Sequence, residues 1–393
     1  MKKSLWFPPQ LRTGPNSDTE HRHATWLELF YDLVFVAIIG ELAHNLSQDV
    51  SLSGFFGFVV LFVPVWWSWV GATFYATRFD CDRDLGHRLL TLLQIAGIAV
   101  LAVNAHHGLE EGSAGFALSY TAVRAVTIFE YIRAGRAIPV VRPLTTRYIA
   151  GFAIAAGLWF VSAFVPPPWR FVLWGLGIIV DLGTPYLVSG ELLKQFPPHL
   201  SHIPERIGLF TIIVLGESIL GVVRGVSEQQ WGTLSATVAL LGLSIAFSLW
   251  WIYFDTVDGS PLRSLRSGYI NLGLIWLYTH LPLVIGLAAT GVGVEHVIST
   301  EPGVGVPLAE RWLICGSVAL CLLALAVIHL ITCTLGTARR RKVLVLYRLG
   351  AATFVLVLAV AGGNLLPITL IALVAVACAS QVILDLRDAT AFA

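Results

Sequence analysis

The apolar residues of this 393-residue chain fall into twelve long stretches, which are separated by short polar segments. A helix crosses the hydrocarbon layer of a bilayer with about 20 consecutive, largely apolar residues. Each stretch has this length, and most of the polar segments are too short to fold by themselves. The pattern predicts an all-α bundle of twelve transmembrane helices, at residues 25–46, 52–77, 87–107, 114–136, 143–165, 169–194, 205–226, 231–257, 268–291, 308–335, 342–361 and 364–387.

Composition and charge support this class and give it an orientation. Charged residues make up 12% of the chain, whereas soluble domains average about 25%. If residues 1–24 form a cytoplasmic tail, 21 of the 25 Lys and Arg residues lie in cytoplasmic segments and three in outer segments, with Arg124 inside a helix. Cytoplasmic loops of membrane proteins are enriched in these residues, so we expect both termini in the cytoplasm. The cytoplasmic set includes Lys2, Lys3, Arg22 and Arg83.

The two halves of the chain share a layout. Residues 26–42 read WLELFYDLVFVAIIGEL and residues 205–220 read ERIGLFTIIVLGESIL, so each segment has one acid near its start and another deeper in the helix. With six helices per half, the two copies enter the membrane in the same orientation. We therefore expect two parallel six-helix repeats, at 25–194 and 205–387.

The same two strings resemble the hallmark segments of the bacterial low-temperature-requirement A (LtrA) family, and the resemblance extends from about His21 to the C-terminus. It implies a multi-spanning membrane protein of the bacterial inner membrane; the family name records a growth phenotype and implies no reaction. A second resemblance is to the potassium channels whose first helix carries an F-S-D motif. Residues 30–32 read Phe-Tyr-Asp here, while residues 210–212 read Phe-Thr-Ile and lack the aspartate.

Ionisable residues inside the predicted helices are the candidates for function. Such a residue near the bilayer centre costs roughly 2.5–3.5 kcal/mol on insertion scales, so it faces the bundle interior or water. The candidates for transport or coupling are Glu28, Asp32, Glu41, Arg124, Asp181, Glu205 and Glu217. We expect Asp32 and Glu217 to carry the coupling, because they lie deep in repeat-related helices.

Some of these residues also have a structural interpretation. Arg124 requires a partner, and a pair with Asp32 or Asp181 can be purely architectural. Glu28 and Glu205 lie at helix starts, where the helix dipole favours negative charge. Their role as caps is as well supported by the sequence as a role in gating.

Metal and cofactor chemistry is not expected. The outer loop carries His106, His107, Glu110 and Glu111, whose side chains suit a divalent metal, but their spacing is more typical of a solvated loop. The five cysteines form no Cys-x-x-Cys motif, so neither a disulfide nor a zinc site is predicted. They are Cys81, Cys315, Cys321, Cys333 and Cys378.

Two further features concern the helices themselves. Pro64, Pro185 and Pro282 are predicted to interrupt their helices, and broken helices can line a substrate site. His280 lies beside the last of these prolines, and a satisfied core histidine is the favoured interpretation.

Three classes of function are compatible with these features. The first, which we favour, is a proton- or ion-coupled transporter of a small solute. The second is a channel for a monovalent cation, in which Phe30 and Phe210 form an apolar constriction. The third is a protein that supports lipid or envelope homeostasis in the cold. No catalytic grouping, phosphate loop or cofactor motif is found, so we expect no enzyme and no nucleic-acid partner. The expected partners are the lipid bilayer, a solute or ion and, optionally, further copies of the chain.

Overall fold

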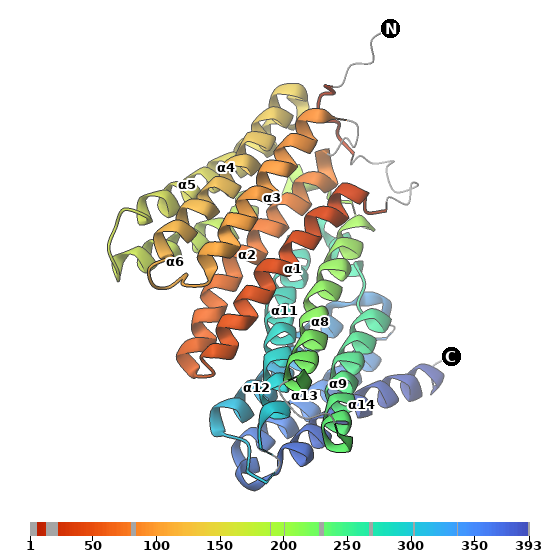
Figure 1. The fold of residues 1–393 in the computed structure, drawn as a ribbon. Coiled ribbons are helices and arrows are strands. Elements are labelled where there is room, and N and C mark those ends of the chain that lie inside the picture. Colours follow the sequence, from red (N-terminus) through yellow and green to blue (C-terminus); the bar gives the residue numbers. More distant parts are fainter. Residues whose placement is uncertain are drawn as a thin grey trace. The chain divides into compact units, whose positions relative to one another are not determined.

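The computed structural model of the chain describes residues 6–12, 23–79, 84–188, 190–199, 201–227, 232–266, 270–301, 303–335 and 337–391. Lys2, Lys3, Arg22, Cys81 and Arg83, on which the sequence predictions drew, lie outside these ranges. Within them, every regular element is an α-helix or a 3₁₀ helix (Figure 1). The prediction of an all-α fold is confirmed.

Ten helical segments in the described part of the chain are long and apolar enough to cross a membrane. They contain α2 (Leu52–Phe79), α3 (Leu85–Ala105), α5 (Arg142–Ser162), α6 (Trp169–Gly183), α8 (His202–Ser227), α9 (Thr233–Thr256), α11 (Ile270–Ser299), α12 (Leu308–Ile331), α13 (Ala338–Ala361) and α14 (Pro367–Ala391). Two other long helices, α1 (Trp26–Gln48) and α4 (Ser113–Ala137), are not among the ten. Both carry ionisable residues in their interiors, such as Asp32 and Arg124.

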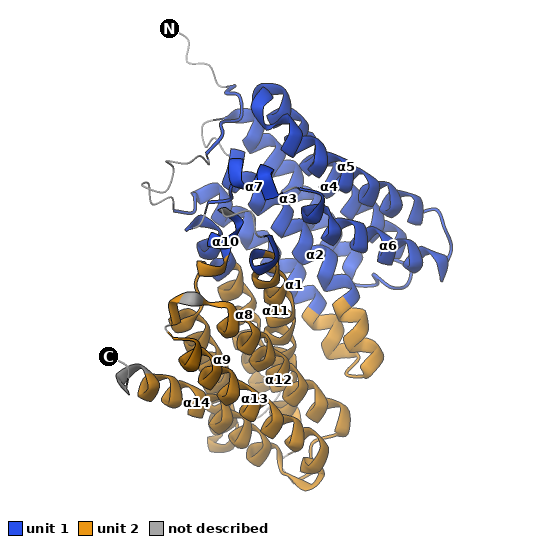
Figure 2. Cartoon of the chain, turned by 180° about the vertical axis from the view of Figure 1, so that it is seen from behind, with its two compact units in different colours: residues 1–42, 60–209, 262–273 blue, residues 43–59, 210–261, 274–393 orange. Residues whose placement is uncertain are grey.

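The chain divides into two compact units (Figure 2). Unit 1 comprises residues 1–42, 60–209 and 262–273. Its helices α3, α4, α5 and α6 pack in chain order, each against the next. Asp84 caps the start of α3, where its carboxylate accepts hydrogen bonds from the backbone N–H groups of Gly86 and His87. A side-chain oxygen at this position satisfies donors that the first helical turn leaves free.

Unit 2 comprises residues 43–59, 210–261 and 274–393. In this unit α12 packs against α13, α13 against α14, and α14 against α9. Close approach of α8 and α11 depends on glycine, because a Cβ atom at Gly221 would lie 2.3 Å from the carbonyl oxygen of Gly291. A Cβ atom at Gly225, four residues further along α8, would lie 2.9 Å from the carbonyl oxygen of Glu295. Such Gly-x-x-x-Gly faces let the backbones of membrane helices come together.

The compact units do not follow the boundaries of the predicted repeats. Residues 43–59 belong to unit 2, although they lie inside the predicted first repeat. Residues 205–209 and 262–273 belong to unit 1, although they lie inside the predicted second repeat. The duplication itself stays a prediction.

Of the three helix interruptions predicted at prolines, one is confirmed and two are wrong. The predicted helix at 169–194 is broken: α6 ends at Gly183, a 3₁₀ helix follows at Thr184–Leu187, and the short α7 occupies Gly190–Gln195. Pro185 lies in the 3₁₀ helix, where the missing N–H removes a hydrogen bond that an α-helix needs. Pro64 and Pro282, by contrast, lie inside continuous helices α2 and α11. Membrane helices tolerate proline where neighbouring groups satisfy the freed carbonyl.

Candidate functional site

A small cavity lies inside unit 1, where α1, α2, α3, α4 and the first turns of α8 meet. The space open to the centre of a water molecule is about 20 Å³, which is enough for a single water. Titratable side chains from all five helices line it: Glu28 and Tyr31 of α1, Tyr75 of α2, His87 of α3, Glu130 of α4 and Arg206 of α8. The cavity therefore collects charged groups from segments that are far apart in the sequence.

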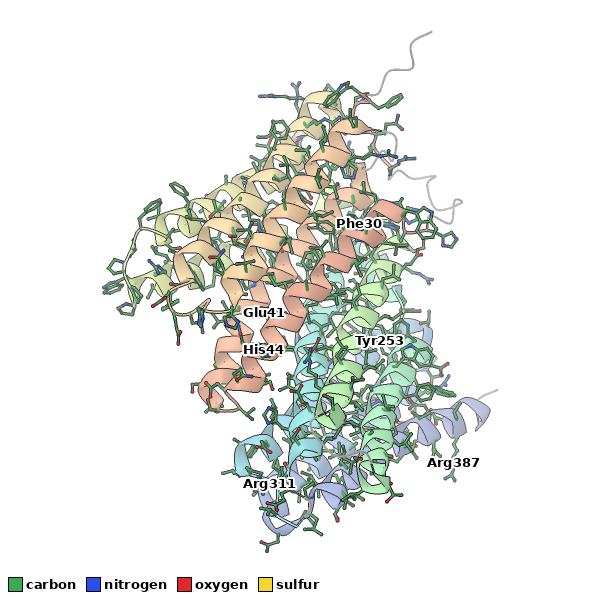
Figure 3. All side chains as sticks on the ribbon, in the orientation of Figure 1. Phe30, Glu41, His44, Tyr253, Arg311 and Arg387 are labelled. Atoms are coloured by element: carbon green, nitrogen blue, oxygen red, sulfur yellow. The ribbon has the colours of Figure 1, made fainter. Side chains whose placement is uncertain are left out.

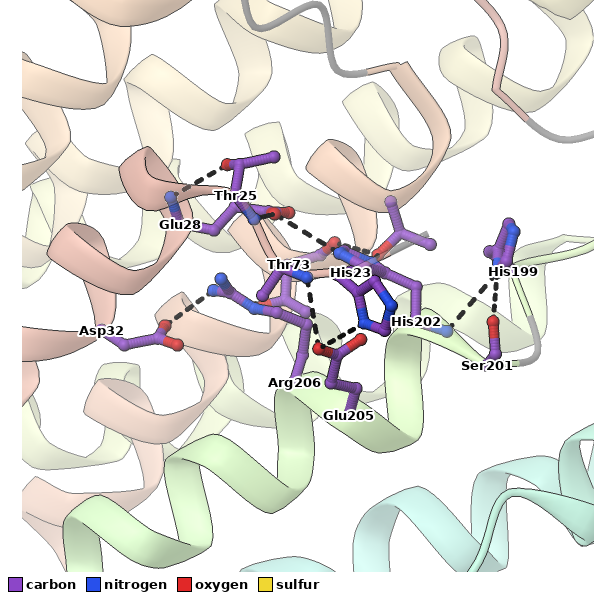
Figure 4. A network of polar contacts seen from close by, with 12 residues as sticks. His23, Thr25, Glu28, Asp32, Thr73, His199, Ser201, His202, Glu205 and Arg206 are labelled. Atoms are coloured by element: carbon purple, nitrogen blue, oxygen red, sulfur yellow. Dashed lines mark hydrogen bonds and ion pairs between the residues drawn. The ribbon is translucent and has the colours of Figure 1, made fainter. Parts of the chain in front are cut away.

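Asp32 and Arg206 form a buried ion pair beside this cavity (Figure 4). The guanidinium Nη2 of Arg206 lies 2.6 Å from Oδ1 of Asp32, and the indole Nε1 of Trp69 donates a hydrogen bond of 2.8 Å to the same oxygen. The side chains of Asp32 and Arg206 are 2% and 1% exposed. A charge removed from water to this degree depends on its partner for stability.

Glu28 caps the first turn of α1 and also contacts α8. Its Oε2 accepts a 2.8 Å hydrogen bond from the N–H of Thr25, and its own N–H donates to Oγ1 of Thr25 at 3.2 Å. This reciprocal pair is a capping box, as the structural interpretation of Glu28 anticipated. The same carboxylate oxygen lies 3.3 Å from Nε2 of His202 (Figure 4).

His202 is bonded through both ring nitrogens. Its Nδ1 lies 3.1 Å from Oγ1 of Thr77, and the hydroxyl of Thr77 donates its hydrogen to the carbonyl oxygen of Thr73 at 2.8 Å. A hydroxyl has one hydrogen to donate. If the Thr77 hydroxyl donates to Thr73, its contact with His202 uses a hydrogen on Nδ1 of the ring.

Glu130 forms the opposite wall of the cavity. His87 Nδ1 lies 3.2 Å from its Oε1, and the Nε2 amide of Gln94 donates to its Oε2 at 3.0 Å. Gln94 also donates to Oγ1 of Thr127 at 3.3 Å. Glu130 is 2% exposed, so its charge interacts with the groups around it more strongly than with solvent.

Several buried polar atoms around the site form no hydrogen bond with any residue in the described ranges. They are the Tyr31 hydroxyl, Oδ2 of Asp32, Oγ1 of Thr73, and Nε and Nη1 of Arg206. None of these four residues is more than 4% exposed. Unmade hydrogen bonds of buried groups are costly, so the site is suited to water, a hydrated ion or a proton.

A sequence comparison identifies the family. The sequence model of the bacterial low temperature requirement A protein (LtrA) matches residues 23–380. The chain belongs to the LtrA family. It is also 27% identical over 298 residues to the uncharacterized protein RA0937 of Rhizobium meliloti (strain 1021), an alignment that covers 72% of this chain and 71% of that protein. The family and the many apolar helices together make it a multi-pass membrane protein.

A second buried ion pair of this LtrA protein joins α4 and α6, also within unit 1. The Nε of Arg124 lies 3.2 Å from Oδ2 of Asp181 and 3.0 Å from the hydroxyl of Tyr120, which itself donates to Asp181 at 2.5 Å. Of the two partners proposed for Arg124 from the sequence, Asp181 is therefore the one observed. The guanidinium also lies 4.9 Å from the ring centroid of Phe152. Gly71 of α2 leaves room for it, since a Cβ there would lie 2.6 Å from Nη1.

The other acids predicted to take part in transport do not line the cavity. Glu217 belongs to unit 2, where Arg224 Nη1 lies 2.7 Å from its Oε1 and 3.4 Å from Oε2 of Glu295. Glu205 accepts a hydrogen bond from the N–H of Ala24 at 3.3 Å. In unit 1, Glu41 lies 2.5 Å from Nδ1 of His106.

The aromatic constriction remains a prediction. Phe30 lies on α1 and is 52% exposed (Figure 3), whereas Phe210 of α8 is buried. The two residues belong to different units.

His107 and His280, two histidines outside the cavity, have ordinary partners. His107 Nδ1 lies 3.4 Å from Oε2 of Glu110, and in the described ranges no three His, Cys, Asp or Glu side chains are placed to hold a metal ion. His280 is fully buried, with Nδ1 2.7 Å from the carbonyl oxygen of Trp276 and Nε2 3.1 Å from the hydroxyl of Tyr253. It is a satisfied core histidine, as predicted.

His202 and Arg206 complete the site and are not among the residues predicted from the sequence. Arg206 is a basic residue near a helix start, which the topology alone explains, and His202 precedes the predicted helix at 205–226. A usable signal was present in the spacing. Glu28 and Asp32 on one helix, and His202 and Arg206 on the other, are both separated by four residues, so each pair shares a helix face.

Proposed function

We propose that this LtrA protein is a proton-coupled secondary transporter of a small solute, and that the cavity of unit 1 binds the coupling proton. The observation that carries the proposal is the contact between His202 and Glu28. With its hydrogen on Nδ1, a neutral imidazole has a lone pair on Nε2. That lone pair would face a carboxylate oxygen at 3.3 Å. One further proton, on Nε2, turns this contact into a charge-assisted hydrogen bond.

The charge balance around the cavity supports the same proposal. Among the described residues that line the cavity, Glu28 and Glu130 are acids and Arg206 is the one arginine, which pairs with Asp32 beside the cavity. His87 and His202 contact Glu130 and Glu28, and histidine commonly serves as a proton carrier in proteins. Intramembrane acids paired with histidine are typical of proton relays in transporters. A site with a surplus of acids gains most from binding a proton or a small cation.

In this proposal Glu28 and Asp32 exchange the proton, while Arg206 holds Asp32 in place. Glu217, Glu41 and Glu205 are the further coupling candidates. We assign the pair of Arg124 and Asp181 to holding α4 against α6, because both its charges are fully buried and matched. No enzymatic activity and no cofactor or metal is proposed.

The proposed topology adds α1 and α4 to the ten apolar segments, which gives the twelve predicted spans. Residues 1–24 then form a cytoplasmic tail, and 25–194 and 205–387 form the two six-helix repeats. Both termini face the cytoplasm of a bacterial inner membrane. The proposed partners are the lipid bilayer, a small solute and protons, in a monomer or a homo-oligomer.

Proton movement in proteoliposomes tests the proposal. Purified protein is reconstituted with a pH-sensitive dye inside the vesicles, the potential is set with potassium and valinomycin, and small solutes are added one class at a time. We expect saturable proton uptake with one solute class, abolished by Asp32→Asn and by Glu28→Gln. Glu191→Gln is the matched control, because this acid is 85% exposed in the same unit.

Two results would overturn the proposal. Cation current that follows the voltage and needs no solute would indicate the channel instead. Vesicles that remain silent with every solute class, or uptake that survives both cavity variants, would point to a role without proton coupling.

A further inference from the structure

An open cleft lies at the end of α4 in unit 1, away from the acid cavity. Its volume is about 360 Å³, and it runs between the chain segment 6–12 and the last turns of α4. The segment contributes Pro8 and Pro9 to one wall. The helix contributes Phe129, Ile132, Arg133 and Arg136 to the other.

The proline wall is held in place by a defined set of contacts. Arg133 donates from Nη2 to the carbonyl oxygen of Phe7 at 2.8 Å, and its Nη1 lies 2.5 Å from Oδ2 of Asp84. The N–H of Phe7 donates to the other oxygen of Asp84 at 3.3 Å, and the N–H of Arg12 donates to the carbonyl oxygen of Arg78 at 2.8 Å. The cleft is therefore a built feature with two fixed walls.

The helix wall changes character along its length. Phe129, Ile132, Arg133 and Arg136 follow the spacing i, i+3, i+4 and i+7, which places them on one face of α4. Phe129 is 51% exposed, so the inner part of the stripe is apolar and open. The outer part is basic. Arg133 is committed to Phe7 and Asp84, whereas Arg136 is exposed and hydrogen-bonds to no residue in the described ranges.

We propose that this cleft binds one anionic phospholipid, with the acyl chains along Phe129 and Ile132 and the headgroup phosphate on Arg136. Guanidinium groups bind phosphate oxygens through paired, charge-assisted hydrogen bonds. Basic pockets at the membrane edge bind the headgroups of anionic lipids, and apolar surface directly beneath accommodates the chains. Pro8 and Pro9 on the opposite wall have no backbone N–H groups that could donate to a phosphate. Headgroup recognition therefore depends on Arg136.

Lipid binding to the full-length purified protein tests this assignment. The protein is prepared in detergent and titrated with phosphatidylglycerol, and retained lipid is counted by native mass spectrometry. One lipid is expected to bind in preference to phosphatidylcholine. Arg136→Gln is expected to weaken this binding about fivefold, the loss of one basic contact at a membrane surface, and Arg136→Lys to weaken it less.

The controls separate a lipid site from general attraction to positive charge. Arg339→Gln removes the same charge from an exposed position at the start of α13 and is expected to leave binding unchanged. Inorganic phosphate at equal concentration is expected not to compete. The assignment is wrong if Arg136→Gln binds phosphatidylglycerol like the unaltered protein, if Arg339→Gln weakens binding equally, if phosphatidylcholine binds as well, or if phosphate alone displaces the lipid.

Discussion

His202 and Glu28 meet at 3.3 Å between Nε2 and Oε2, although 174 positions separate them in the chain. The contact joins the first turn of α8 to the first turn of α1 inside unit 1. One turn further along each helix, Arg206 reaches Asp32. Two neighbouring i,i+4 pairs thus connect the helices through four ionisable side chains.

The first prediction concerns the Asp32–Arg206 pair. Arg206→Gln leaves a buried carboxylate without its cation and should lower the free energy of unfolding by about 3–5 kcal/mol. Asp32→Asn leaves the guanidinium unmatched and should also destabilise the protein. The double variant should lose less than the sum of the two single losses, because the neutral pair leaves no unmatched charge. Denaturant unfolding of the purified protein measures all three variants, and strictly additive losses would contradict a direct pair.

The second prediction concerns the space that Gly71 leaves for Arg124. A methyl group at this position would lie 2.6 Å from Nη1, so Gly71→Ala must displace a guanidinium that is held by Asp181 and Tyr120. Overpacking of this kind costs about 1–3 kcal/mol. Gly157→Ala on α5 is the matched control, since no atom lies within 4 Å of its built Cβ. Thermal denaturation should show a lower midpoint for Gly71→Ala alone; equal midpoints would show that α2 adjusts freely.

The third prediction concerns the pH range in which segment 6–12 stays attached. Burial raises the pKa of Asp84, but the hydrogen bonds from Arg133 and from the N–H groups of His87 and Gly86 outweigh it and hold the pKa below the usual value. The folded protein therefore prefers the ionised carboxylate. This stabilisation is present above the ordinary aspartate range, near pH 4, and is lost as the pH falls through the lowered pKa.

Hydrogen exchange at the N–H groups of Phe7 and Arg12 checks this expectation. Protection should stay constant from pH 8 to about pH 5 and fall only in more acidic solution. Asp84→Asn should reduce protection already at neutral pH, because an amide keeps the helix cap but has no charge for Arg133. Protection that is lost between pH 7 and 5 would show that another group holds the segment.

The sequence predicted the helices well because their signal is local. Twelve apolar stretches of bilayer length can be read without knowing what they pack against, and the prediction at 114–136 agrees with α4 to within one residue at each end. The effect of proline was harder to predict. Pro64 and Pro185 look alike in sequence, yet only Pro185 lies where the α-helix ends. The difference depends on which neighbouring groups satisfy the freed carbonyl, and only the packed structure reveals them.

The site was predictable in part. Glu28 and Asp32 stood out because acids inside apolar helices are costly. Arg206 did not, because a basic residue at a helix end is fully explained by topology. Its pairing with Asp32 is a tertiary contact between residues 174 positions apart. Spacing rules predict contacts only within one helix or between neighbouring segments. Likewise, the sequence offered both Asp32 and Asp181 to Arg124, and only the packing of α4 with α6 selects Asp181.

The protonation state of His202 shows whether a proton is held between His202 and Glu28. Protein labelled with ¹⁵N at histidine is examined by NMR at neutral pH, and a His202→Gln sample assigns the signals. We expect two protonated ring nitrogens in the unaltered protein. In Glu28→Gln we expect a neutral ring with its hydrogen on Nδ1, because the new amide can donate to Nε2. A neutral His202 with a bare Nδ1, or identical spectra from the two proteins, would contradict a proton held between His202 and Glu28.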